Sequence, residues 1–110
     1  MQQLFTPKER LLVYKQLLNR FTVYKKQFSI NPCLSGLCSE IKDITGKPLI
    51  INNVTLIFYF PELLTQKPLI MSYGDKYWWS INTIQGVNAR IKAIKNAITL
   101  VSKDLEEFEN

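Results

Sequence analysis

Apolar residues recur every three or four positions near the N-terminus of the chain. Just before them, Thr6, Pro7 and Glu9 follow the pattern of a capping box: threonine precedes the first turn, proline opens it, and glutamate comes three residues after the threonine. Together these features predict a long amphipathic helix over residues 7–28. Its apolar stripe comprises Leu11, Tyr14, Leu17, Leu18, Phe21, Tyr24 and Phe28.

A second stripe of the same spacing lies near the C-terminus and predicts a helix over residues 87–108. Two long amphipathic helices bury their apolar faces when they pack together, so we predict an all-α fold, a compact small helical domain formed by residues 1–110. Shorter helices between the long ones would cover their far side. The second stripe comprises Ile91, Ile94, Ile98, Val101, Leu105 and Phe108.

The middle of the chain is less regular. Pro32 ends the first helix, and a short helix is expected from Ser35 or Gly36 to the turn at residues 46–48. This helix would place Leu37, Cys38, Ile41 and Ile44 on one face.

Residues 49–60 favour a strand by residue type, although Asn52 or Asn53 could cap a helix there. We predict a helix, and an α+β fold with a strand near 49–60 is the alternative. Pro61 and Glu62 would open a further turn through Leu64. A loop is expected to begin at Lys67-Pro68 and to run into Tyr77-Trp78-Trp79.

Basic residues are concentrated in the first predicted helix. Residues 7–28 contain six basic residues and one acidic residue, Glu9, so this segment alone carries a net charge of +5. The whole chain has the same net charge. These basic side chains either solubilise an exposed helix face or form an anion-binding surface. Charges are also separated along the last predicted helix, where a run of acidic residues follows four basic ones: Arg90, Lys92, Lys95 and Lys103.

Both tryptophans of the chain lie in the Tyr77-Trp78-Trp79 segment. Indole rings stack on bases, but adjacent aromatic residues also serve as core plugs. Arg90 lies near the predicted start of the last helix, where its guanidinium could bind a phosphate or carboxylate group of a partner. The alternative is a structural ion pair with Glu62 or Asp75. The candidate ligand- or partner-binding residues are therefore Lys15, Arg20, Lys25, Lys26, Trp78, Trp79, Arg90 and Lys92.

Several chemistries lack their usual residues. The chain has no histidine, which is the commonest general base and transition-metal ligand, and Cys33 and Cys38 do not have redox or zinc spacing. The phosphate-binding glycine motifs are also missing. We predict no catalytic residues, no cofactor and no metal. The apolar stretches are too short to span a membrane, and no secretory signal is visible.

Four motifs occur in a fixed order: Gly36-Leu37-Cys38, Pro61-Glu62-Leu63-Leu64 with Lys67-Pro68, Tyr77-Trp78-Trp79-Ser80, and Arg90-Ile91-Lys92-Ala93-Ile94. This combination, over residues 34 to 100, resembles a group of small accessory proteins of tailed phages and prophages, commonly without an assigned activity. The resemblance implies a phage protein acting in the host cytoplasm, and it brings no catalytic residues.

The function expected from these observations is that of a non-enzymatic phage accessory binding protein. Its partner would be anionic: a nucleotide signal, nucleic acid or an acidic host protein, as in counter-defence. One alternative is a structural or packaged component of the virion. Another is a DNA-binding regulator, which is disfavoured because no helix-turn-helix spacing is present. The sequence leaves homo-oligomerisation open.

Overall fold

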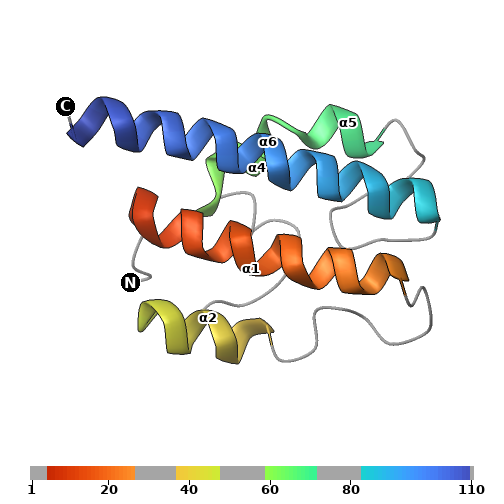
Figure 1. Ribbon diagram of the computed structural model, residues 1–110, viewed down its shortest axis with the longest axis horizontal. Helices are drawn as coiled ribbons and strands as arrows, with labels where there is room; N and C mark the ends of the chain where they lie inside the picture. Colours follow the sequence, from red (N-terminus) through yellow and green to blue (C-terminus); the bar gives the residue numbers. More distant parts are fainter. Residues whose placement is uncertain (1–4, 27–36, 48–58, 72–82, 110) are drawn as a thin grey trace.

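The computed structural model describes residues 5–26, 37–47, 59–71 and 83–109, and these ranges contain helices and no strand (Figure 1). The all-α prediction is confirmed, with two long helices packed together and shorter ones between them. Most of the segment 49–60, for which helix and strand were both considered, lies outside the described residues. Of this segment the structure describes only Tyr59 and Phe60, and both are buried. The helices are α1 (Pro7–Lys26), α2 (Leu37–Thr45), α4 (Pro61–Leu64), α5 (Lys67–Met71) and α6 (Ile84–Glu109).

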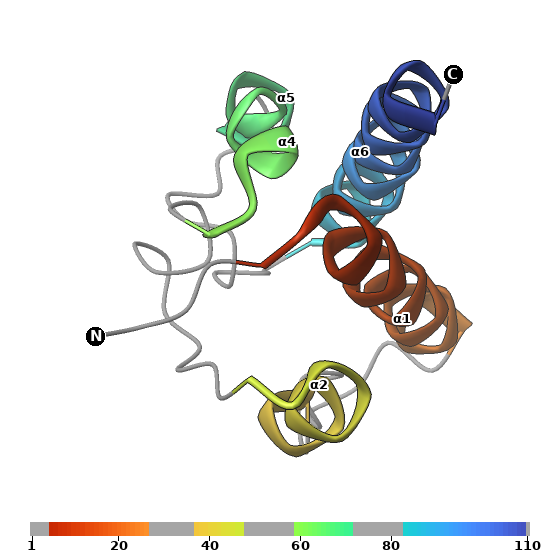
Figure 2. The same ribbon diagram turned by 90° about the vertical axis from the view of Figure 1, so that its left-hand side faces the viewer.

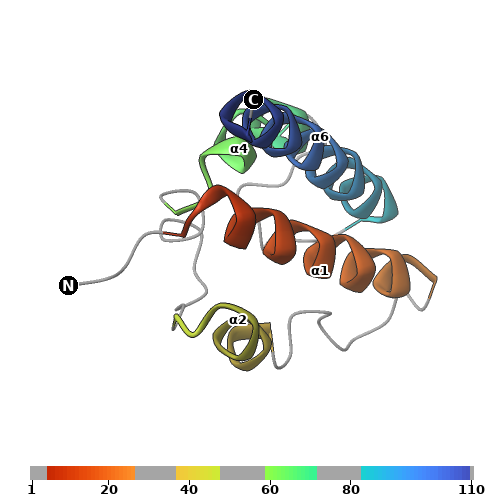
Figure 3. The same ribbon diagram turned by 60° about the vertical axis from the view of Figure 1, so that its left-hand side comes forward.

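The two long helices run side by side in opposite directions, and the short helices flank them (Figure 1). Helix α2 packs beside α1, whereas α4 and α5 pack against α6. Viewed from the end, α4 and α5 lie beside α6, α2 lies beside α1, and none of the described helices lies on the opposite side of the α1–α6 pair (Figure 2). In a third view α2 and α4 lie on opposite sides of α1 (Figure 3).

The centre of the molecule is the contact between α1 and α6. In α1 the fully buried apolar residues are Val13, Tyr14, Leu17 and Phe21, while the predicted stripe members Leu11 and Leu18 are only partly buried. The buried face is rotated from the predicted one because α1 packs against α2 and α4 as well as α6. In α6 the buried line includes Val87, Ala93, Ile94, Ala97 and Val101.

Helix α1 begins with the predicted capping box. The Thr6 amide donates to Glu9 Oε1 over 2.8 Å, and the Glu9 amide donates to Thr6 Oγ1 over 3.2 Å. Two amide groups that have no acceptor within the helix are thereby satisfied. Lys47 also donates to Glu9 Oε1, over 2.5 Å, which ties the residues after α2 to the start of α1.

Helix α6 begins three residues earlier than predicted. Thr83 caps it, since its Oγ1 accepts from the Gly86 amide over 3.0 Å. A threonine three residues before glycine lacks the glutamate of a capping box, which is why the sequence pattern did not reveal this start.

Helix α2 agrees with its predicted span, and Gly46 ends it with a φ of 72° while its amide donates to Lys42 O over 2.7 Å. Within it Ile41 is buried, whereas Ile44, predicted on the same face of the helix, is 41% exposed near the end of α2. The prediction of a loop from Lys67 was wrong, because α5 occupies residues 67 to 71. Pro68 is compatible with this helix, since a first-turn residue needs no amide donor.

We expect the capping box to stabilise the whole fold, because α1 contributes most of the central contact. Replacing Thr6 by alanine removes the acceptor for the Glu9 amide and should lower the free energy of unfolding by about 1 kcal/mol in urea titrations. Thr99→Ala is the matched control, since this exposed threonine lies within α6 and donates only to Lys95 O. Equal effects of the two substitutions would contradict the role assigned to the cap.

Candidate anion-binding surface

One row of basic side chains runs along the exposed side of α1. Lys15 and Lys26 are eleven residues apart, or about three helical turns, so they lie on the same side of the helix. Lys8 belongs to the same row, and the end of the helix adds Lys25. All four side chains belong to exposed residues.

A second row follows the exposed side of α6 and consists of Lys92, Lys95 and Lys103. Both rows therefore consist of exposed residues of the two long helices. We call the exposed sides of α1 and α6 together the outer face. Its lysines are Lys8, Lys15, Lys25, Lys26, Lys92, Lys95 and Lys103.

Three carboxylates are engaged in contacts between helices. Glu9 pairs with Lys47, Glu40 with Arg20, and Glu62 with Arg10. Apart from Lys8, none of the outer-face lysines forms an ion pair or hydrogen bond with another residue that the structure describes. Glu9, Glu40 and Glu62 thus neutralise cations between the helices, whereas Asp104 and Glu106 are exposed on α6 close to Lys103. The excess of exposed positive charge is therefore clearest along α1.

Arg20, a predicted binding residue, participates in the contact between α1 and α2. Its Nε donates to Glu40 Oε2 over 3.0 Å and its Nη2 pairs with Glu40 Oε1. Gln16 donates to the same carboxylate over 2.5 Å. The Arg20 guanidinium and the Gln16 amide lower the pKa of Glu40 despite the opposing effect of burial. The structure therefore gives Arg20 a role in holding α2.

Arg90 differs most from its predicted setting. Because α6 starts at Ile84, Arg90 lies in the second turn instead of the first, and its side chain has no exposed surface. Its Nη1 donates to Gly86 O over 2.9 Å. A partner on the outer face would not meet this guanidinium. Lys15, Lys25 and Lys26 are exposed on α1, and Lys92 is exposed on α6. Trp78 and Trp79 lie outside the described residues, so their stacking role stays a prediction.

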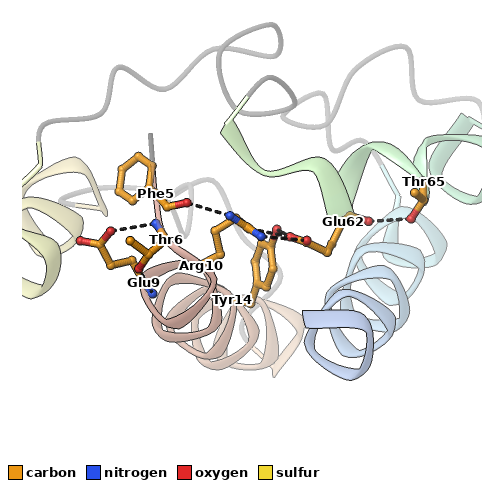
Figure 4. A network of polar contacts seen from close by, with 7 residues as sticks. All are labelled: Phe5, Thr6, Glu9, Arg10, Tyr14, Glu62 and Thr65. Atoms are coloured by element: carbon orange, nitrogen blue, oxygen red, sulfur yellow. Dashed lines mark hydrogen bonds and ion pairs between the residues drawn. The ribbon is translucent and has the colours of Figure 1, made fainter. Parts of the chain in front are cut away.

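A polar cluster surrounds Glu62, which the sequence analysis considered only as an ion-pair partner for Arg90. Arg10 Nε donates to Glu62 Oε1 over 2.9 Å and Arg10 Nη2 to Oε2 over 3.3 Å, while Tyr14 donates to Oε1 over 2.5 Å (Figure 4). Arg10 Nη1 also donates to Phe5 O over 2.7 Å. The sequence signal for this cluster was Arg10 and Tyr14, four residues apart, which places both on one side of α1.

Aromatic rings enclose this cluster. Phe60 lies 5.1 Å from the Phe5 ring centroid and 5.6 Å from that of Tyr14, and Tyr59 packs edge-on to Phe5 at 6.1 Å. Burial and the neighbouring Glu62 carboxylate raise the pKa of Tyr14 far above its usual range, so its hydroxyl stays protonated and donates. Three hydrogen bonds from Arg10 and Tyr14 thus occupy most of the acceptor positions of the Glu62 carboxylate.

Among the described residues, no group of histidine, cysteine, aspartate and glutamate side chains could hold a metal ion. Within the same residues, no helix combines the length and apolarity needed to cross a membrane. Comparisons with models of protein families, with curated proteins and with solved structures found no match to this chain.

The two arginine–glutamate pairs differ in burial and should differ in strength. Glu62→Gln leaves a nearly buried arginine, 15% exposed, without its counter-charge, and we expect a loss of about 3 kcal/mol in unfolding free energy. Glu40 is 40% exposed, and the same substitution there should cost under about 1 kcal/mol. Urea titrations of both variants test this, and a larger loss for Glu40→Gln would contradict it.

Acid should weaken the contacts of α2 with α1. Hydrogen bonds from Lys47 and Thr6 outweigh desolvation and lower the pKa of Glu9, and the pKa of Glu40 is also lowered, both from 4.5. The folded state then binds these protons less tightly than the unfolded chain. Stability is therefore full above about pH 5 and falls as the pH drops through the lowered values.

Urea midpoints measured between about pH 6 and pH 3 test this acid dependence. A variant carrying Glu9→Gln and Glu40→Gln should show a shallower decline than the wild-type protein, because it has lost both shifted groups. An identical decline in the two proteins would show that other carboxylates cause it.

Proposed function

We propose that this chain is a non-enzymatic phage accessory protein that holds an anionic partner on the outer face of α1 and α6. The observation that carries the proposal is the separation of charge: Glu9, Glu40 and Glu62 are taken up by contacts between helices, and the outer-face lysines are left exposed. A one-sided distribution of positive charge attracts anions and speeds their association.

The spacing of the lysines suits an extended partner better than a single small anion. Lys15 and Lys26 are about 16 Å apart along α1, and Lys92 and Lys103 have the same separation along α6. Because the Debye length is about 8 Å at physiological ionic strength, each lysine acts mainly on the anionic group next to it. A partner that carries several separated negative charges would therefore gain most.

Within this proposal Lys15, Lys25, Lys26 and Lys92 supply the binding charge, and Trp78 and Trp79 supply stacking where the partner is a nucleotide or nucleic acid. Arg20 and Arg90 contribute indirectly, by fixing α2 and the interior of α6. Binding is favoured over catalysis because the chain has no histidine and the Glu62 carboxylate is engaged by Arg10 and Tyr14. The resemblance to phage accessory proteins makes host factors, as in counter-defence, the natural partners.

We expect the protein to bind heparin, a soluble polyanion, and to elute at lower salt when Lys15, Lys26 and Lys92 are together replaced by glutamine. These lysines make no described contact within the protein, so the variant should unfold at the same urea concentration as the wild type. Lys42→Gln is the control, because Lys42 is exposed on α2, away from the outer face, and should leave elution unchanged.

A complementary measurement follows tryptophan emission while nucleotides or short oligonucleotides are added at low salt, which reports on Trp78 and Trp79. Passage of the wild-type protein through heparin without retention, together with unchanged emission for every anion, would overturn the proposed function.

A further inference from the structure

The exposed side of α1 carries apolar as well as basic residues. An α-helix makes one turn in about 3.6 residues, so positions three or four apart lie on the same side of it. Six exposed residues of α1 follow this spacing, and we call them the α1 ridge: Lys8, Leu12, Lys15, Asn19, Val23 and Lys26. Because all six belong to one helix, they share one side of it whatever the positions of the other helices.

Lysine and aliphatic side chains occupy adjacent lines of the α1 ridge. Lys15 and Lys26 are eleven residues apart, and so are Leu12 and Val23, so the members of each pair are separated by about three helical turns. Leu12 is 48% exposed and Val23 is 47% exposed. Single exposed aliphatic residues are common on protein surfaces, but two of them aligned with a lysine row form a surface that is both basic and apolar.

The acidic residue of α1 does not offset this charge. Glu9 is the only carboxylate of the helix, and it pairs with Lys47, which follows α2. Glu40 of α2 accepts from two residues of α1, and Asp43, three residues later, is exposed on the same side of α2. Four exposed lysines of α1 thus have one exposed carboxylate of α2 near them, and positive charge remains in excess along the α1 ridge.

A partner gains most if it matches both kinds of side chain. Phosphates would pair with the lysines, but a charged phosphate backbone gains nothing by covering Leu12 and Val23. A helix that lies in a membrane surface needs a broad apolar face, whereas Asn19 separates these two residues and lysines lie beside them. A protein can offer carboxylates and apolar side chains together. The α1 ridge therefore favours an acidic protein over nucleic acid or lipid.

The spacing of the α1 ridge also indicates the shape of this partner. The described residues contain no strand whose edge could pair with the backbone of an extended peptide. A helix satisfies its own backbone hydrogen bonds and presents side chains every three or four residues, which is the spacing of the ridge.

We infer that the α1 ridge docks an acidic amphipathic helix of a protein partner. Carboxylates of this helix pair with Lys15 and Lys26, and its apolar side chains cover Leu12 and Val23. The inference rests on the proposed function, because it specifies which class of anionic partner the exposed side of α1 takes. The ridge extends about 27 Å, from Lys8 to Lys26, and a partner helix of about 18 residues matches that length.

The test uses the full chain and a labelled synthetic helix of about 20 residues, with leucines along one side and glutamates beside them. A scrambled peptide of the same composition, whose leucines are spread around the helix, is the matched control. Fluorescence anisotropy should show that the amphipathic peptide binds about tenfold more tightly than the scrambled one, because only the former covers both aliphatic side chains at once.

Variants separate the apolar contribution from that of charge. Leu12→Gln combined with Val23→Gln keeps the net charge and introduces residues that favour helices. This variant should bind the amphipathic peptide about tenfold more weakly, while its urea midpoint and its elution from heparin stay unchanged. Lys15→Gln combined with Lys26→Gln should weaken binding to both the peptide and heparin.

Leu100→Gln is the matched control for the aliphatic residues, since Leu100 is 40% exposed but belongs to α6. It should leave binding of the amphipathic peptide unchanged. A loss equal to that of the Leu12 and Val23 variant would mean that exposed apolar area in general, and not the α1 ridge, controls binding, and would overturn the inference.

The other outcomes distinguish this inference from the function on which it rests. Retention on heparin with equal affinities for the amphipathic and scrambled peptides would overturn the inference and leave the proposed function in place. Tighter binding to duplex DNA, to single-stranded DNA or to vesicles of equal parts phosphatidylcholine and phosphatidylserine than to the amphipathic peptide would do the same. Failure to bind heparin and every one of these probes would overturn both.

Discussion

The carboxylate of Glu62 is the constraint on which the arrangement of the helices depends. A four-residue helix such as α4 has no stability of its own, because helix nucleation is unfavourable over so short a span. Its position is set by the bonds from Arg10 and Tyr14, which fix α4 against α1. Arg10 also holds the Phe5 carbonyl, and the residues after α4 reach α6 through the hydrogen bond from Asn96 to Gln66.

This internal use of carboxylates determines the character of the surface. A charged group away from water needs a counter-charge and further hydrogen bonds, and the planar fork of arginine supplies both at once. The buried Glu62 accordingly takes Arg10 and Tyr14, and the more exposed Glu40 takes Arg20 and Gln16. Glu9, Glu40 and Glu62 are therefore unavailable to offset exposed lysines. The positive charge exposed along α1 is thus in part a consequence of how the helices are held together.

The sequence predicted those features that depend on local chemistry. Helical periodicity, the Thr6–Glu9 capping box and the glycine that ends α2 act over a few residues, and each is present in the structure. Features that depend on tertiary contacts were missed or wrong. The burial of Arg90, the pairing of Arg10 with a residue 52 positions away, and the exposure of Ile44 follow from which helices become neighbours, and periodicity within one helix does not reveal this. For α5, the proline signal was ambiguous, since proline suits both a loop and a first helical turn.

The separation of structural arginines from surface lysines makes folding and the proposed binding independent in physical terms. The ion pairs that fix the short helices and the residues after α2 to α1 involve Arg10, Arg20 and Lys47. Exposed lysines such as Lys15, Lys26 and Lys92 contribute little to stability, so the fold places few limits on their number or spacing. The surface of this fold can therefore change its charge, and with it the partners it attracts, while the cluster around Glu62 keeps the helices in place.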